Sequence, residues 1–415
     1  MTFIADLHIH SKYSRACSLN LDLPHIDTWC QLKGIDLVST ADFTHPLWFK
    51  DLNDQLEECE GGIYCLKNKF KGQNVDVDLP EKCQKKVCFI CSTEISLIYK
   101  KKEKVRRVHL IILAPNLKIA SLINISLEKI GNIHSDGRPI LGLDSEKLVK
   151  ILLDISPKIQ VIPAHVWTPH FAVFGSKSGF DSVEECFGKM SKHICALETG
   201  LSSDPAMNRQ ISKNDQYVLI SNSDAHSPQK LGREATIFDT KCNFDSILKV
   251  LRFDHHKIGT IEFFPQEGKY YADGLRNENL CLFPKETKKY NYISPQTGKK
   301  ITVGVLHRIS TLADKPLDHQ NNKNKYFYII PLVEILSEIL KVGPNSKKVQ
   351  NKYFSLLKQL GSEFAILKDI AIEEISSFDE LLGEAIKRMR NGKVIIKPGY
   401  DGEYGVISLF AEDEI

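Results

Sequence analysis

Short apolar runs that each stop at a polar residue recur through the first 230 residues of the chain. They read FIADLHIH, IDLVSTADF, VCFICSTEIS, IQVIPAHV, ICALETG and YVLISNSDAH, and RRVHLIILAP carries its histidine at the front of the run. Helix-like segments such as PHIDTWCQLKG and DSEKLVKILLDIS separate the runs. Strand–helix alternation with continuous apolar strands is typical of a parallel sheet covered on both faces. We therefore predict an α/β fold with a β/α barrel over residues 1–262.

The alternation ends after residue 262. Residues 263–310 are rich in Gly, Pro, Asn, Lys and Tyr, which predicts a small irregular module. From 311 to 415 apolar residues recur three and four positions apart in PLVEILSEILKV, KVQNKYFSLLKQLG and FDELLGEAIKRMRNG, which predicts a mainly helical domain. Within the barrel region, residues 51–90 carry Cys59, Cys65 and Cys83 in a Lys-rich context and are interpreted as a loop insertion.

The composition adds few constraints. With 42% hydrophobic, 26% charged and 9% aromatic residues, the chain has the make-up of a soluble globular protein, and a net charge of +3 indicates no class of partner. No apolar run approaches about 20 residues, so we expect no transmembrane helix and no membrane partner. The start lacks the pattern of a secretory signal. Several of the 11 cysteines lie inside apolar runs, which favours a reducing, cytoplasmic location.

The polar residues at the strand ends are candidate metal ligands. Chemistry collects at the C-terminal ends of the strands in barrels of this kind. Their mixture of imidazole and carboxylate suits zinc, manganese or iron. A bridging carboxylate such as Glu94 could hold two metals about 3.5–4 Å apart, the arrangement used for phosphoester cleavage. Any one of these residues could be purely structural, but the whole set predicts a metal site. It comprises His8, His10, Asp42, Glu94, His109, His165, Asp224 and His226.

In chain order, these residues resemble the ligand motifs of PHP domains, a family whose fold is a distorted seven-stranded β/α barrel holding two or three metals. The match is closer to one branch. The segments DLHIHSKYS, LKGIDLVSTADFTHP, GRPIL, PAHVWTP, ETGLSSD, SNSDAHSPQKLGRE, GVLHRI and GEYGVISL resemble endonuclease Q, nearly from end to end. This resemblance implies a nuclease that nicks DNA on the 5′ side of deaminated bases, such as uracil and hypoxanthine, and of abasic sites. We expect it to act as a monomer.

The resemblance also implies how the metals are held. Two divalent ions (zinc, manganese or magnesium) would share Glu94, and Asp42 would be either a ligand or a residue that orients an imidazole. A third site lacks ligands, because Arg15 and Phe43 stand where many PHP domains have an acidic residue or a histidine. His226 would then have no partners. One metal would be held by His8, His10, Glu94 and Asp224, the second by Glu94, His109 and His165, and the catalytic residues would be Glu94, Asp224 and His226.

One expected feature is missing. Relatives usually carry two Cys-x-x-Cys knuckles between the barrel and the helical domain, as in a zinc ribbon. Here Ser294 and Thr297 stand in the second knuckle, and only Cys281 remains near the first. One thiolate cannot close a tetrahedral site, so we expect no structural zinc in residues 263–310. The module would instead be held by an aromatic cluster of Tyr270, Phe283, Tyr290 and Tyr292.

Two segments are candidate contacts to the DNA backbone. The turn LKVGPNSKK, with Gly343, resembles half of a helix-hairpin-helix, in which backbone N–H groups bind phosphate and Lys347 would add charge. An ordinary interhelical turn is the alternative. Arg233 could clamp a phosphate, or it could form an ion pair with Glu234 or Glu198.

Two loops beside the metals are candidates for reading the base. Uracil and hypoxanthine present a carbonyl where cytosine and adenine present an amine, and N–H donors could read that difference. HVWTPHF and GLSSDP follow strand ends, so we place the donors there and take Ser202 as a substrate contact. Trp167 could stack on an extruded base, or it could be a core aromatic at the barrel mouth.

Two other functions fit part of these observations. A PHP phosphatase of a small phosphoester would use the same metal site, although it has no evident need for residues 311–415. A DNA-binding protein with weakened catalysis would explain Arg15, Phe43 and the lost knuckles, although the two-metal ligand set is intact. The leading hypothesis is a metal-dependent endonuclease of DNA repair.

Overall fold

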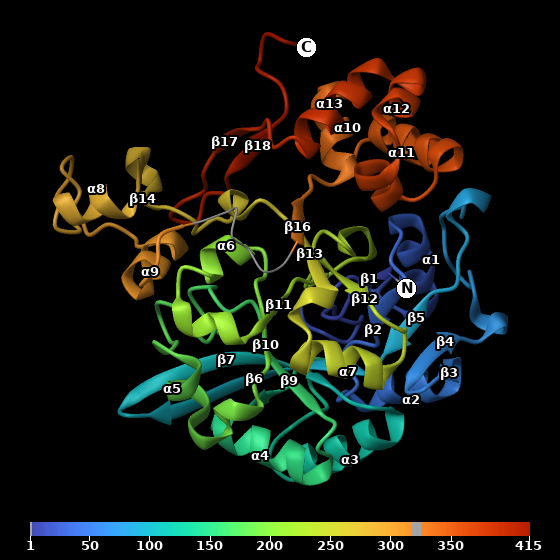
Figure 1. The fold of residues 1–415 in the computed structure, drawn as a ribbon, viewed down its shortest axis with the longest axis vertical. Helices are drawn as coiled ribbons and strands as arrows, with labels where there is room; N and C mark the ends of the chain where they lie inside the picture. Colours follow the sequence, from blue (N-terminus) through green and yellow to red (C-terminus); the bar gives the residue numbers. More distant parts are fainter. Residues whose placement is uncertain (1, 318–324) are drawn as a thin grey trace.

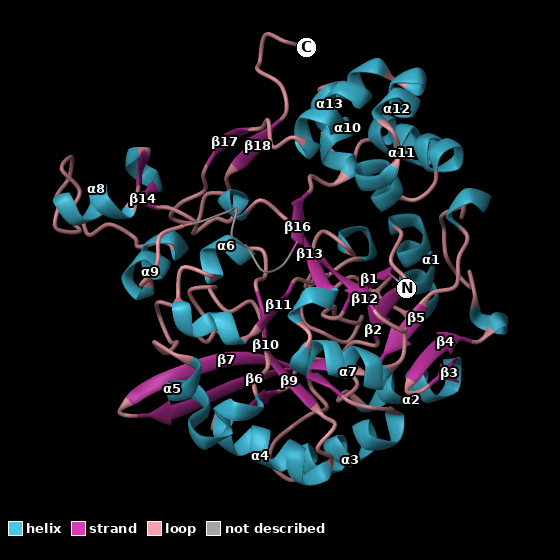
Figure 2. Ribbon diagram, viewed as in Figure 1, coloured by secondary structure: helices cyan, strands magenta, loops and turns pink. Residues whose placement is uncertain are grey.

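The apolar runs at the start of the chain form strands where the sequence predicts them. The computed structural model describes residues 2–317 and 325–415 and shows a mixed α/β protein (Figures 1 and 2). VCFICSTEIS forms two strands, separated by Cys91 alone. The strands from these runs are β1 (Thr2–Asp6), β2 (Leu37–Ser39), β5 (Cys88–Ile90), β6 (Ser92–Lys101), β7 (Lys104–Leu113), β9 (Gln160–Pro163), β10 (Ala196–Glu198) and β11 (Val218–Ile220).

Helices lie between these strands and are defined by local capping. Asp22 accepts a hydrogen bond from the backbone N–H of His25 at the start of α1 (Leu23–Lys33), and Gly34 ends the helix in the left-handed conformation. Asp144 caps α4 (Ser145–Ile155) in the same way. The other helices of this region are α2 (Pro46–Gln55), α3 (Leu117–Glu128), α5 (Val183–Phe187), α6 (Pro205–Asn208) and α7 (Phe244–Phe253).

Three sheets position the strand ends. The largest has the order β16-β13-β12-β1-β2-β5-β4-β3, the second β8-β6-β7-β9, and the third pairs β10 with β11. Val166 donates to Glu198 O beyond the ends of β9 and β10, and Ile9 forms a parallel bridge with Ala225 beyond the ends of β1 and β11. The remaining strands of these sheets are β3 (Leu56–Glu60), β4 (Ile63–Leu66), β8 (Ile140–Leu141), β12 (Ala235–Asp239), β13 (Ile258–Glu262) and β16 (Lys325–Tyr328).

An apolar core joins the three sheets. Strands from all of them contribute fully buried side chains to one cluster, including Leu37 from β2, Ile111 from β7, Ile162 from β9 and Ile220 from β11. Most of the polar residues that follow β1, β9 and β11 are also buried, whereas Asp224 and His226 are half-buried. Burial of that many polar groups demands partners for them.

The module that follows β13 projects from the body of the protein (Figure 1). The expected aromatic cluster is wrong, because Phe283, Tyr290 and Tyr292 are each more than one-third exposed. Instead, Ser294 and Thr297 both donate hydrogen bonds to the carboxylate of Glu278, which precedes Cys281 by three residues. Hydrogen bonds therefore join the two turns at the knuckle positions. The elements here are β14 (Asp273–Leu275), β15 (Leu280–Leu282), α8 (Pro284–Lys289) and α9 (Val305–Leu312).

The C-terminal region is mainly helical, and two of the contacts that join it to the rest of the protein are made by strands. β16 pairs in parallel with β13, from Gly259 opposite Lys325 to Glu262 opposite Tyr328. The hairpin of β17 and β18 packs on the module through Ala272 N–H to Gly399 O. No described helix is long and apolar enough to cross a membrane. The elements are α10 (Leu332–Leu340), α11 (Lys347–Leu360), α12 (Ile372–Phe378), α13 (Glu380–Arg390), β17 (Ile395–Lys397) and β18 (Val406–Ser408).

Candidate metal centre

The segments that follow β1 and β11 pair with each other and bring the first candidate ligands together. β1 ends at Asp6, and the backbone then pairs with the segment that follows β11. Asp224 N–H donates to His8 O at 2.9 Å, and His10 N–H donates to Ala225 O at 3.1 Å. These two backbone hydrogen bonds fix the side chains of His8, His10 and Asp224 around one point.

The first ligand group consists of His8, His10, Glu94 and Asp224. Nε2 of His10 lies 3.0 Å from Oδ1 of Asp224 and 3.4 Å from Oε2 of Glu94, and Nε2 of His8 lies 3.5 Å from Oε1 of Glu94. Both Nε2 atoms and Oδ1 of Asp224 are buried and make no hydrogen bond to the described residues. Buried polar atoms without partners are costly, and these converge on one point. The group therefore fits a divalent metal ion.

The second group shares Glu94 with the first and adds His109 and His165. Oε1 of Glu94 lies 2.8 Å from Nδ1 of His109 and 3.2 Å from Nε2 of His165. The two imidazole nitrogens are themselves 3.2 Å apart. Glu94 on β6 thus faces both groups, which is the arrangement expected of a carboxylate that bridges two metals.

Two further carboxylates orient the imidazoles of the first group. Nδ1 of His8 donates to Glu198 at 3.1 Å, and Nδ1 of His10 lies 3.2 Å from Oδ1 of Asp42. A proton held on Nδ1 leaves the lone pair of Nε2 directed at the metal. Asp42 belongs to neither ligand group. We expected Asp42 to be either a ligand or a residue that orients an imidazole, and its position favours the second role. Glu198 has the same role at His8, and sequence reasoning missed it.

The backbone is strained where it presents these side chains. Asp42, His165 and Asp224 have φ of 32°, 30° and 48°, in the left-handed region that residues other than glycine rarely adopt. Close packing fixes the loop of His165, because a Cβ on Gly200 would come within 2.5 Å of the His165 Cβ. Strain of this kind persists only where the surroundings determine the conformation, and it is concentrated at functional sites.

The electrostatics keep the carboxylates charged. Burial opposes ionisation of Glu94 and Asp224, but the neighbouring histidines outweigh it and hold both pKa values below their usual range. Burial lowers the pKa of His109 to about 4, so its imidazole is neutral near pH 7 and has a lone pair to offer. Charged carboxylates and a neutral imidazole are the forms that bind metal ions.

Sequence reasoning missed a cation at this site. Nη1 of Arg138 lies 2.9 Å from Oε2 of Glu94, and the pKa of the guanidinium is raised, because this carboxylate outweighs the effect of burial. Arg138 belongs to the GRPIL segment, between α3 and β8, where no hydrophobic pattern indicated a role. His226 lies in neither ligand group. Its Nδ1 lies 2.8 Å from the backbone oxygen of Asp224, and its ring packs on His10.

A pocket of about 520 Å³ opens beside the two groups. His109, His165, Asp224 and His226 line its inner part, and Ser202 lines it as the sequence suggested. Trp167 does not line this pocket: it is 1% exposed, donates to Asn208 Oδ1 at 2.8 Å and packs on Phe174. Its position favours the core role over stacking on a base. The rim carries two tyrosines and a lysine that sequence reasoning missed, Tyr270, Tyr404 and Lys269.

The other predicted DNA contacts, Arg233, Gly343 and Lys347, are not among the residues that line this pocket. Arg233 forms neither expected ion pair; its guanidinium donates to the backbone oxygens of Ser223 and Asp224 at 2.8 and 3.4 Å. It therefore supports the segment that carries Asp224. Gly343 is exposed in the turn before α11, and Lys347 is exposed at the first position of the helix, which the side chain of Ser346 caps.

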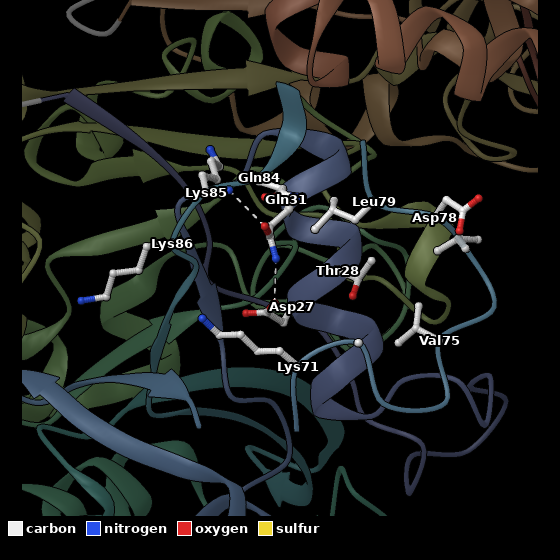
Figure 3. Close-up of a pocket in the computed structure, with 12 residues that line it drawn as sticks. Asp27, Thr28, Gln31, Lys71, Val75, Asp78, Leu79, Gln84, Lys85 and Lys86 are labelled. Carbon is white, nitrogen blue, oxygen red and sulfur yellow. Dashed lines mark hydrogen bonds between the residues drawn. The ribbon is translucent and has the colours of Figure 1, made fainter. Parts of the chain in front are cut away.

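A second pocket, of about 720 Å³, lies against α1 (Figure 3). Its lining comes from α1 and from the segment between β4 and β5, and Gln31 donates to Asp27 while accepting from Lys85 N–H. None of its lining residues belongs to a metal-ligating group among the described residues. The chemistry of the two ligand groups is therefore confined to the first pocket.

Comparison with known proteins identifies close structural relatives. The crystal structure of PfuEndoQ, a lesion-specific endonuclease from Pyrococcus furiosus, matches with a TM-score of 0.85 and 31% identity, over 100% of this chain and 98% of that one. A structure of endonuclease Q with a 27-mer duplex that carries an abasic lesion at its active site matches with a TM-score of 0.82 and 30% identity, over 100% and 99%.

Sequence comparison gives a partial match as well. Residues 331–393 match the family model of the MJ0043 C-terminal domain. The uncharacterized protein MJ0043 of Methanocaldococcus jannaschii is 33% identical over 252 residues, which is 59% of this chain and 31% of that protein. The chain thus spans about a third of the length of that relative.

The fold and the site define a DNA-cleaving hydrolase of DNA repair, with side chains able to hold divalent metal ions. The match to the two endonuclease Q structures covers nearly the whole of both chains, and this narrows the class to one family. The chain belongs to the endonuclease Q family.

Proposed function

We propose that this protein nicks DNA on the 5′ side of deaminated bases, uracil and hypoxanthine, and of abasic sites, with two divalent metal ions. The observation that carries the proposal is the carboxylate of Glu94 facing two ligand groups, three of whose members, His109, His165 and Asp224, line a pocket of about 520 Å³. A site of this form suits phosphodiester cleavage. The abasic lesion at the active site of the related enzyme supports the substrate class.

The strand arrangement supports a PHP-type barrel as the scaffold. Seven strand segments (β1, β2, β5 with β6, β7, β9, β10 and β11) follow one another through pairing or the contacts described above, and the Ile9–Ala225 bridge brings the last beside the first. His8, His10, Glu94 and Asp224 would hold one ion, and Glu94, His109 and His165 the other. When bound, these ions supply Lewis-acid stabilisation of the charge that develops on the phosphoryl oxygens.

Arg138 and Lys269 would bind the phosphates. The Arg138 guanidinium lines the pocket beside Glu94, where it can donate to a non-bridging phosphoryl oxygen. At the rim, the Lys269 ammonium lies 5.8 Å from the ring centre of Tyr270 and 5.7 Å from that of Tyr404. A cation held between two rings offers a point charge to a flanking phosphate.

His226 would move a proton. If its Nδ1 donates to the backbone oxygen of Asp224, the neutral ring has its lone pair on Nε2. Burial lowers the pKa of His226, so the neutral form dominates near pH 7. The ring lines the pocket and can accept a proton from the attacking water as the P–O bond forms.

The base would be read at the rim of the pocket. Tyr404 is 71% exposed and lines the pocket, as does the GLSSDP loop that contains Ser202. An exposed ring can stack on an extruded base, and backbone N–H donors of the loop can meet a carbonyl but not an amine. The exposed turn at Gly343 and Lys347 would bind the backbone farther along the duplex.

The proposal is tested with the purified chain, manganese or zinc, and duplexes that carry one uracil, one hypoxanthine, one abasic site or no lesion. We expect a single nick on the 5′ side of each lesion and none in the intact duplex. Release of phosphate from small phosphoesters, without nicking of any duplex, would identify a phosphatase and refute the proposal.

A further inference from the structure

Three thiols converge at the edge of the largest sheet, away from the catalytic pocket. Sγ of Cys65 lies 2.6 Å from Sγ of Cys59 and 4.0 Å from Sγ of Cys88. Their sulfur atoms all lie within 4.8 Å of one another. Among the described residues, this cluster and the two groups at Glu94 are the sets of side chains arranged to hold a metal ion.

A β-bulge turns Cys59 toward its partner. β3 and β4 pair in antiparallel register from Leu56 opposite Leu66, but the register shifts between Glu58 and Glu60, and Cys59 is the extra residue. A bulge of this kind re-aims the side chain of the unpaired residue. On the other side, β4 pairs with β5 through Tyr64 opposite Phe89, so the next pair along is Cys65 and Cys88.

A fourth thiol comes from a distant part of the sequence. Cys242 lies in the loop between β12 and α7, and its side chain packs, like that of Cys88, against the same apolar core cluster. The loop packs against the turn between β3 and β4, where Phe244 N–H donates to Gly61 O at 3.0 Å. Four thiols on four segments are thus gathered in one place, although sequence analysis had placed Cys59 and Cys65 in a loop insertion.

The spacing of the sulfur atoms bears on what joins them. Zinc binds thiolates at about 2.3 Å in a tetrahedron, which places its sulfur ligands roughly 3.8 Å apart. The separation of Cys65 from Cys88 is close to that value, and Cys59 and Cys65 are nearer than two unbonded thiols pack. A disulfide would explain why Cys59 and Cys65 are close, but it would not explain why Cys88 and Cys242 lie beside them. A metal ion bound by all four thiols explains both observations.

We propose that Cys59, Cys65, Cys88 and Cys242 form a structural site for one thiolate-bound divalent metal ion of the zinc type. The ion would cross-link the edge hairpin of β3 and β4 with β5 and with the loop before α7. The segment that follows this hairpin reaches the C-terminal region, since Lys82 Nζ donates to Gln359 O at 2.7 Å. The site is separate from the knuckle positions at Cys281, Ser294 and Thr297.

Cobalt substitution tests the proposal without interference from the catalytic ligands. Neither group at Glu94 contains a cysteine, so a thiolate-to-cobalt charge-transfer band can arise only from a thiol site. We expect the reduced full-length protein to bind cobalt with this band, and to contain one zinc per chain, beyond any ions held at Glu94, that competes with the cobalt. Cys59→Ser with Cys88→Ser should abolish the band, and Cys195→Ser, a matched cysteine outside the cluster, should retain it.

A second variant tests whether loss of the band results from loss of a ligand and not from misfolding. Cys242→Ser removes one loop thiol and leaves both strands intact, so the band should weaken or shift while the far-UV circular dichroism is unchanged. The proposal is overturned if the reduced wild-type protein shows no thiolate band, or if the band survives in Cys59→Ser with Cys88→Ser. A Cys59–Cys65 disulfide found by mass spectrometry, with no cobalt taken up after reduction, would also overturn it.

Discussion

Arg138 donates to the carboxylate of Glu94 at 2.9 Å, the same carboxylate that faces both ligand groups. The side chain that would bridge two cations is therefore itself paired with a third positive charge. Because the guanidinium stays charged at every pH used for an assay, it favours binding of a phosphate anion at the site and not binding of the metals.

Removal of this guanidinium should reduce catalysis more than metal binding. For Arg138→Ala we expect nicking to fall by about 10²-fold, the usual effect of losing one donor to a developing oxyanion. Arg138→Lys keeps the charge and should retain part of the activity. Single-turnover rates at saturating metal measure the effect. A rate restored by adding metal would mean that Arg138 acts on metal affinity instead.

Loss of a metal ligand should abolish nicking while DNA binding persists. Asp224→Asn removes the charge of a ligand without changing its size, and His8→Ala removes a nitrogen ligand. We expect neither variant to cut at limiting metal, and both to shift a uracil duplex in a binding assay. His134→Ala, an exposed histidine paired with Glu128, is the control. Full activity of either ligand variant would refute the site assignment.

The carboxylates that orient the imidazoles should affect affinity and not the chemistry itself. For Glu198→Gln and Asp42→Asn we expect metal to bind about 10- to 100-fold more weakly, the usual cost of losing a hydrogen bond to a ligating histidine. Excess metal should then recover most of the nicking rate. Metal titrations followed by nicking measure both quantities. A rate that excess metal fails to restore would place these residues among the ligands.

Base selectivity should depend on Tyr404 and not on Trp167. Tyr404→Ala should slow cutting at uracil and hypoxanthine more than at an abasic site, which has no base to stack. Tyr404→Phe should be nearly normal. Trp167→Ala should destabilise the fold by about 3–5 kcal/mol and affect all three substrates alike. Nicking rates on the three duplexes, together with the melting temperatures of the variants, distinguish loss of a base contact from loss of stability. Equal losses for Tyr404→Ala would exclude it as the base contact.

Buried Glu262 should make the fold less stable at high pH. Burial raises its pKa from 4.5 to about 8, and the folded protein therefore retains a proton that the unfolded chain releases. The free energy of unfolding should fall as pH rises from about 4.5 to about 8. Glu262→Gln removes this titration, so its melting temperature should exceed that of the wild type increasingly at higher pH. A difference independent of pH would contradict the prediction.

The parts of the site that sequence alone predicted are those set by local patterns. His8 and His10 follow one apolar run, Asp224 follows another, and each run forms a strand. Arg138 was missed because its partner Glu94 lies 44 residues away in sequence and no periodic signal marks it. Glu198 stands at the end of the apolar run ICALETG, but its partner His8 lies 190 residues away, so the run alone does not reveal its role. Trp167 follows the ligand His165 by two residues, yet its indole turns into the core toward Asn208.

The pairing of β16 with β13 has a consequence for how the protein can be divided. A fragment that stops before residue 325 would uncover one edge of β13, a strand that is buried along its whole length. An open strand edge pairs with whatever backbone it meets, so we expect such a fragment to self-associate. In engineering terms, the region before β16 cannot be excised from the C-terminal helical region by a simple cut, because a hydrogen-bonded strand pair joins the two.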